Sequence, residues 1–197
     1  MADEPGPGDR AGATPGALVD VEVVGFDRTG SGFAELDSLV DLARTTLIRE
    51  GLAAGRLDLV AVDPDEMAEL NRTHLGHDGP TDVLSFPLDA DHAIDGFDAD
   101  LDLDLDPAVG VGPDDVDGAP PLHLGDVIVC PEVARRQAPG HTGSEGAELC
   151  LLVIHGVLHV LGHDHAEPAE TSAMQARERH HLAAIGHRHP ADREAPC

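Results

Sequence analysis

The sequence predicts an α+β fold, in which a small mixed sheet of four strands packs with helices. Four short segments carry the alternating or continuous apolar residues that are typical of strands. Longer segments between and after them have apolar residues three and four positions apart, which predicts amphipathic helices. One of the helices is apolar nearly all round, so we expect it to be buried in the domain.

In the first half of the chain, strands and helices are predicted to alternate. We assign a strand to 20–23, a helix to 34–50, a strand to 57–62, a helix to 64–71, and a turn followed by a strand to 79–87. Gly51 ends the first helix and Pro64 begins the second, as their backbone preferences favour. Pro87 has no N–H group to donate to a neighbouring strand, which favours a strand end or an edge of the sheet.

The second half of the chain is predicted to contain one strand and then helices. We assign a strand to 125–130, a short helix to 131–137, the apolar helix to the segment between the capping-box sequence at 142–145 and Gly162, and a last helix to 168–186. In a capping box, the side chains of the first and fourth residues satisfy free backbone N–H groups where a helix begins. Thr142 and Glu145 have this spacing.

The length of the chain fits one domain, which we place at 17–186 of the 197 residues. Residues 1–16 are rich in Gly, Pro, Ala and Asp without periodicity and are predicted to be a disordered tail, while 187–197 are predicted to be a C-terminal tail. Between residues 89 and 118 lie eleven Asp and no Lys or Arg. Their spacing lacks the Gly and the bidentate Glu of a calcium loop, so we expect a solvated acidic insert.

The composition limits the classes of partner. The formal net charge is −26, and every Lys or Arg position is Arg. Such a surface repels nucleic acids and anionic membranes at long range, and salt screens this repulsion. Three Cys without a CxxC spacing argue against a disulfide framework. Because there is no basic and apolar leader and no apolar segment long enough to span a bilayer, we expect a cytoplasmic protein without a membrane partner.

Residues 155–165 have the spacing of a metal site. His155 and His159 are four residues apart, so on a helix they lie on one face and their ring nitrogens reach a common point. Gly162 can adopt the left-handed conformation that ends a helix and turns the chain back, which allows His165 to return as a third ligand. Three imidazoles with an open fourth position are typical of catalytic zinc, and we expect one zinc ion per chain.

The same spacing occurs in the metzincin proteases, where a Glu general base follows the first His. This chain has Gly156 at that position, so the protease base is missing and a water activated by zinc is the expected nucleophile. Asp164 is a further catalytic candidate, since a carboxylate there can orient a ligand imidazole or transfer a proton. The alternative for Asp164 is a turn-forming role beside a ligand.

Contacts with a phosphate backbone are expected from basic side chains. Arg72, Arg135 and Arg136 are the candidates, with the alternative that they only keep the surface soluble. Ser85 is a candidate for the lining of the cleft, with the alternative that it satisfies backbone groups. Two other functions stay open at this point: a zinc metalloprotease, and a binding factor whose metal is structural.

Three segments together resemble one family. Residues 155–165 resemble the HGxLHLxGxDH signature of the bacterial YbeY family, the rRNA-maturation endoribonucleases. Residues 70–87 resemble its second block, LNxxYRxxDxPTDVLSFP, and 125–130 resemble its GDIxIC strand. The resemblance extends from about residue 19 to 186 and leaves the tails and the acidic insert unmatched.

The resemblance implies a single-strand-specific, metal-dependent endoribonuclease that acts in 3′-end maturation of small-subunit rRNA and in ribosome quality control. Its implied partners are single-stranded rRNA and the small ribosomal subunit rather than DNA, and it implies zinc held by the three His of 155–165. One feature departs from the family: its usual Tyr-Arg pair falls on His74 and Leu75, and Arg72 is the nearest substitute. A ribosome-assembly factor with a structural metal remains the alternative, and the oligomeric state is open.

Overall fold

The structure is a computed structural model that describes residues 19–88 and 122–192. The predicted disordered tail at 1–16 and acidic insert at 89–118 lie outside the described residues. The strands are β1 (Asp20–Arg28), β2 (Ala54–Val62), β3 (Val83–Pro87) and β4 (His123–Val129). The helices are α1 (Leu36–Arg49), α2 (Pro64–Leu75), α3 (Pro131–Gln137), α4 (Glu145–Val160) and α5 (Pro168–Ala184), with short 3₁₀ helices η1 (Ala138–Gly140) and η2 (Pro190–Asp192).

The four strands form one mixed sheet in the order β1-β2-β4-β3. β1 pairs with β2 and β2 with β4 in parallel, whereas β3 is antiparallel to β4 at the edge of the sheet. The α+β class and the mixed four-stranded sheet are therefore confirmed. β1 is longer than the alternating segment 20–23, because its pairing with β2 continues to Arg28 opposite Val62.

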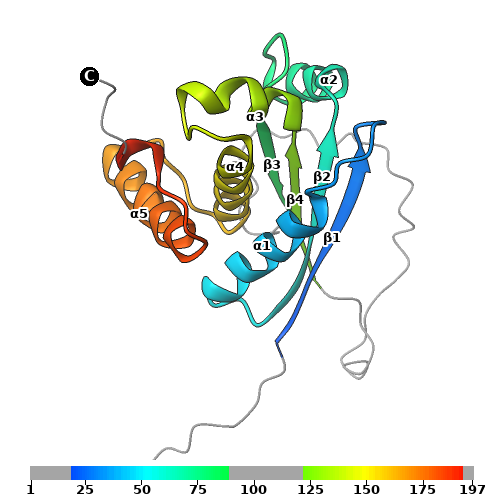
Figure 1. Ribbon diagram of the computed structural model, residues 1–197. Helices are drawn as coiled ribbons and strands as arrows, with labels where there is room; N and C mark the ends of the chain where they lie inside the picture. The colour runs from blue at the N-terminus through cyan, green and yellow to red at the C-terminus, as the bar shows by residue number, and fades with distance from the viewer. Residues whose placement is uncertain (1–18, 89–121, 193–197) are drawn as a thin grey trace, which may run out of the picture.

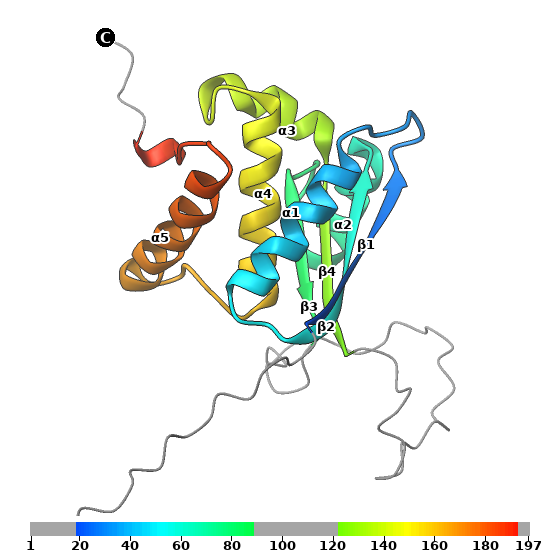
Figure 2. The same ribbon diagram turned by 60° about the horizontal axis from the view of Figure 1, so that its bottom comes forward.

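Helices cover the two faces of the sheet unequally. α4 packs against β3 and β4, with α1 beside it and α5 on its outer side (Figures 1 and 2). The larger core lies here, between the sheet, α1, α4 and α5. A smaller core on the opposite face contains Met67 of α2 and Leu84 of β3. Neighbouring residues of β3 pack into different cores, since successive side chains of a strand point to opposite faces.

The apolar helix is buried as predicted, and most residues of α4 have almost no exposed surface. Its beginning differs from the prediction. Ser144, not Thr142, is the N-cap, and its Oγ accepts a hydrogen bond from the N–H of Ala147 at 3.3 Å. The predicted capping box is therefore wrong by two residues. Thr142 instead donates from Oγ1 to the buried carboxylate of Glu148 at 2.6 Å.

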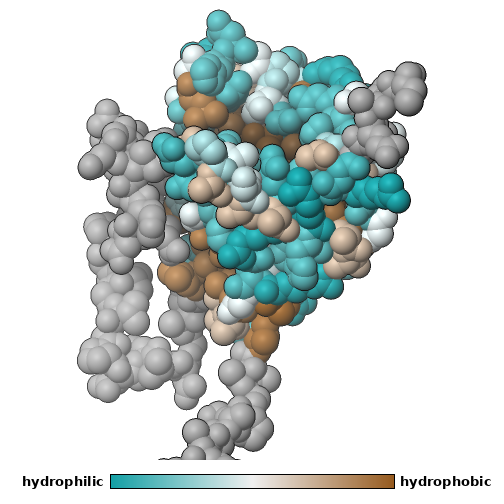
Figure 3. Space-filling view, turned by 90° about the vertical axis from the view of Figure 1, so that its left-hand side faces the viewer, coloured by the Kyte–Doolittle hydropathy of each residue, from teal (hydrophilic) through white to brown (hydrophobic). Residues whose placement is uncertain are grey.

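Residues 187–192, the described part of the predicted C-terminal tail, pack against α5. Arg179 of α5 donates from Nε to Asp192 at 2.9 Å, and His189 is only 6% exposed. The outward side of α5 faces the viewer in Figure 3, where the surface is largely hydrophilic with small apolar areas. Along 19–88 and 122–192, no helix combines the length and the apolar character needed to cross a membrane.

Candidate metal centre

The first two histidines of the motif lie on one face of α4, one turn apart. Their Nε2 atoms are 3.1 Å apart and their ring centroids 4.6 Å apart. A four-residue spacing on a helix produces this proximity without any further contact. In a tetrahedral zinc site with Zn–N bonds of about 2.0–2.1 Å, ligand nitrogens lie about 3.3 Å apart, so the two imidazoles fit a shared ion.

The third histidine returns to the same point because α4 ends in a tight turn. Gly162 has φ = 83°, a left-handed conformation that a side chain would strain. The N–H of His163 bonds to the carbonyl of Leu158, and Thr171 at the beginning of α5 donates to the carbonyl of His165 at 2.8 Å. As a result, one donor atom from each of the three histidines lies within 4.8 Å of the others.

The electrostatic environment keeps the centre receptive to a cation. Burial, as the larger cause, and the neighbouring His155 and His165 together lower the pKa of His159 to about 4. The imidazole of His159 is therefore neutral at neutral pH and has a lone pair to offer. Metal ligation requires neutral imidazole, so the chemistry of the three donors fits zinc.

Glu178 of α5 holds the first ligand in place. Its Oε1 accepts a hydrogen bond from Nδ1 of His155 at 2.7 Å, which leaves Nε2 of that ring facing the other histidines. Burial alone would raise the pKa of Glu178, but the hydrogen bonds from His155 and His189 outweigh it and the pKa is lowered. An ionised carboxylate that orients a ligand imidazole is a common partner in zinc sites.

Sequence analysis missed Glu178. The residue lies 23 positions after His155, and only the packing of α5 against α4 brings the two together. One signal was present: Met174, Glu178 and Leu182 form an i, i+4, i+8 stripe on α5, and all three are buried. A charged residue within an apolar stripe indicates a buried partner.

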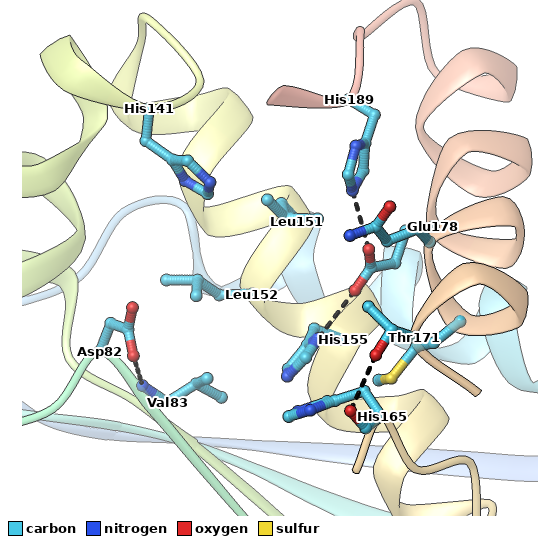
Figure 4. Close-up of a pocket in the computed structure, with 12 residues that line it drawn as sticks. Asp82, Val83, His141, Leu151, Leu152, His155, His165, Thr171, Glu178 and His189 are labelled. Atoms are coloured by element: carbon cyan, nitrogen blue, oxygen red, sulfur yellow. Dashed lines mark hydrogen bonds and ion pairs between the residues drawn. The ribbon is translucent and has the colours of Figure 1, made fainter. Parts of the chain in front are cut away.

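A cavity of about 370 Å³ is lined by two of the three histidines, His155 and His165, and lies within the usual size range of small-ligand sites. His155 and His165 lie at one end of it and His141 and His189 at the other, with Glu178 between His189 and His155 (Figure 4). Apolar side chains of α4, β3 and α5 form much of the wall. The lining residues are Asp82, Val83, His141, Leu151, Leu152, His155, His165, Thr171, Met174, Gln175, Glu178 and His189.

Gly156 has a packing role that the sequence alone did not show. A Cβ at this position would lie 2.6 Å from Cγ1 of Val127 on β4 and 3.1 Å from Oγ of Ser85 on β3. The helix therefore approaches the sheet so closely that a side chain at 156 would require Val127 or the helix to move. A Glu general base has no room there.

Two other predicted site residues lie next to the centre but face other partners. The carboxylate of Asp164 accepts a hydrogen bond from the N–H of His165 at 2.6 Å, which is the turn-forming alternative. Ser85 packs beneath the backbone of α4 at Gly156 and is not among the residues that line the cavity.

The three arginines proposed for phosphate contact lie away from the three histidines. Arg72 is exposed on α2 and pairs with Glu69, and Arg136 pairs with Glu132 of α3 at 3.0 Å. Arg135 lines a second cavity, of about 260 Å³, at the ends of β1 and β2. None of the described residues that line the cavity beside the histidines is Arg.

A second group of potential metal donors, Asp58, His123 and Asp126, lies on β2 and β4. Arg56 already pairs with Asp58, with Nε and Oδ1 2.9 Å apart. This guanidinium supplies the positive charge that the two carboxylates attract. The group is an ion-pair network within the sheet face, whereas in the described parts of the chain His155 bonds to Glu178 and His159 and to no Arg.

Three convergent imidazoles, an orienting carboxylate and an adjoining cavity define a candidate metal-dependent hydrolase. The family model "Endoribonuclease YbeY" matches residues 34–186, and the chain belongs to this family. Membership indicates a hydrolytic nuclease, in agreement with the resemblance found in the sequence. The matched region begins at residue 34, later than the position near 19 that the sequence suggested, and it ends before His189.

Several curated relatives carry the name endoribonuclease YbeY. The relative from Salinispora tropica is 42% identical over 153 residues, which cover 76% of this chain and 87% of the relative. Those from Frankia casuarinae and Mycobacterium leprae are each 38% identical and cover 76% of this chain, and 68% and 75% of the relatives. Among solved structures, the solution structure of TM1509 from Thermotoga maritima matches with 23% identity and a TM-score of 0.47, covering 83% of this chain and 91% of that one.

Proposed function

We propose that this chain is a single-strand-specific, zinc-dependent endoribonuclease that acts in 3′-end maturation of small-subunit rRNA and in ribosome quality control. Its partners are then single-stranded rRNA and the small ribosomal subunit, in the cytoplasm. The activity belongs to a single domain, for which the sequence suggests the bounds 17–186 and against which 187–192 pack. The observation that supports this proposal best is the convergence of His155, His159 and His165 beside a cavity. Family membership supplies the reaction class.

The residues around the histidines have different roles in the proposed reaction. Zinc in such a site activates water as a nucleophile near neutral pH and polarises a phosphoryl oxygen. Glu178 keeps Nε2 of His155 directed toward His159, where the two rings and His165 would hold the ion, and burial keeps His159 unprotonated. Leu151 and Leu152 give the cavity an apolar wall that limits the water around a bound phosphodiester. A cavity of this size admits a single strand more readily than a base-paired duplex.

The two rival functions have less support. A metzincin-like protease needs a Glu base after the first His, and the close approach of Val127 leaves no room for one at Gly156. A purely structural zinc site usually has four protein ligands, whereas the group of donors around His155 contains three among the described residues. Family membership also favours the nuclease over both.

RNA recognition by this chain relies on the metal more than on basic side chains. Asp82 and Glu178 are acidic members of the cavity lining, and the whole chain has a formal charge of −26. A polyanion that approaches such a surface is repelled except where a bound cation attracts a phosphate. We therefore expect removal of the metal to weaken both RNA binding and cleavage.

Zinc content and RNA cleavage test the proposal together. Native mass spectrometry of the wild-type chain should show about one zinc per chain, and His159→Ala should lose the zinc and the cleavage of a fluorescent single-stranded RNA. His180→Ala is the matched control, because His180 is exposed on α5 and outside the group of three. Chelator should abolish wild-type cleavage, a duplex of the same sequence should resist it, and an unfolded protein substrate should release no peptides. Full zinc retention by His159→Ala would refute the metal assignment.

A further inference from the structure

Glu178 is shared between two histidines on opposite sides of its carboxylate. Oε1 accepts from Nδ1 of His155 at 2.7 Å, and Oε2 accepts from Nε2 of His189 at 2.8 Å (Figure 4). Glu178 and His189 are almost fully buried, at 5% and 6% exposure. A buried carboxylate with a donor on each oxygen keeps both hydrogen bonds only while its plane holds this orientation.

The segment that follows His189 determines which of its ring nitrogens carries the proton. Its Nδ1 accepts a hydrogen bond from the backbone N–H of Ala191 at 3.2 Å, so Nδ1 carries a lone pair. The proton of the neutral ring is then on Nε2, which is the atom that faces Glu178. The turn at 189–192 therefore presents a donor, never an acceptor, to the carboxylate.

From these contacts we propose that His189 is a positioning residue for the metal centre. By holding Oε2 of Glu178, it keeps Oε1 on His155 and so keeps Nε2 of His155 directed at the ion. The segment 187–192 becomes part of the metal site, although it lies beyond the region that matches the family model. This inference rests on the proposed zinc site.

Removal of His189 has a specific expected effect. Oε2 of Glu178 would lose its only hydrogen bond from the segment after α5, and the carboxylate could turn to find another partner. The bond to His155 would then weaken, and with it the affinity for zinc. Loss of a carboxylate that orients a ligand costs about 10–100-fold in metal affinity, and we expect roughly 3–10-fold for His189, one contact further from the ion.

The test measures the zinc dissociation constant of the full chain by competition with a fluorescent chelator, together with stability to denaturant. His189→Leu removes the donor and should weaken zinc binding by the amount above. His189→Gln retains an N–H donor at the same reach and should restore most of the affinity. If His189 acts through Glu178, then adding His189→Leu to Glu178→Ala should cause no further loss.

Arg179→Ala is the matched control for a merely structural role. It removes the ion pair between Arg179 and Asp192, which holds the same segment on α5 but does not contact Glu178. This variant should lose some stability and keep the wild-type zinc affinity. Equal zinc affinity in wild type and a folded His189→Leu, or an equal loss in Arg179→Ala, overturns the inference while the zinc site stands. If His159→Ala binds zinc as tightly as the wild type does, both this inference and the proposed zinc site are overturned.

Discussion

Replacement of Gly156 by Ala should destabilise the protein, although Ala is normally the better residue in a helix. The added Cβ would lie 2.6 Å from Cγ1 of Val127 and 3.3 Å from its Cγ2. Val127 is fully buried in β4, and a β-branched side chain has little freedom about χ1, so it cannot move aside easily. The helix must then move away from the sheet.

The loss of stability expected for Gly156→Ala is the balance of two opposing effects. Forcing an extra carbon into a well-packed core costs about 1–3 kcal/mol, whereas Gly to Ala in a helix interior gains about 1 kcal/mol, which leaves a net loss of roughly 1 kcal/mol. Val127→Ala alone should cost roughly 2 kcal/mol through the loss of two buried methyl groups. In the double variant the new Cβ occupies part of the space that Val127 vacates, so the two losses should not add.

Denaturant unfolding of the wild type, the two single variants and the double variant measures this coupling. We expect the double variant to be more stable than the sum of the single losses by about 1 kcal/mol or more, which is well above the usual error of additivity. A Gly156→Ala variant as stable as the wild type, or strictly additive losses, would show that α4 does not approach the sheet as closely as the structure indicates.

Two further predictions concern stability. Without metal, stability should fall as the pH drops from about 6.5 toward about 4, because the unfolded chain protonates His159 near 6.5 while the folded chain does so only near 4; denaturant titrations across this range should show a flatter profile for His159→Leu. Ser144→Ala should cost about 1 kcal/mol through loss of the N-cap bond to Ala147, and an unchanged unfolding midpoint would contradict the cap assignment.

The sequence predicted what depends on local spacing. The convergence of His155 and His159 needs only a helix, and the return of His165 needs only a left-handed residue at Gly162. The sheet was predicted because its strands have alternating or continuous apolar residues. Element ends were less accurate: β1 continues to Arg28 through pairing with β2, and no local pattern marks this extension.

The remaining site residues depend on tertiary contacts that spacing does not encode. Arg72 and Arg136 were candidates because of their charge, but each pairs with a Glu on its own helix. Glu178 and His189 reach the centre because α5 folds back on α4 and the next segment turns onto α5. The apolar stripe on α5 indicates that Glu178 is buried, but nothing in the sequence says that its partners are His155 and His189.

The position of the carboxylate separates this site from a protease that has the same histidine spacing. In the metzincin pattern the Glu follows the first His on the ligand helix. Here that position is Gly156, closed by contact with the sheet, and the carboxylate comes from α5 and binds Nδ1 of His155 instead. From that side of the ring it orients a ligand, and its two oxygens accept hydrogen bonds from His155 and His189. A zinc ion held by His155, His159 and His165 would supply the activated water and the positive charge that attack on a phosphodiester needs, without a base at position 156.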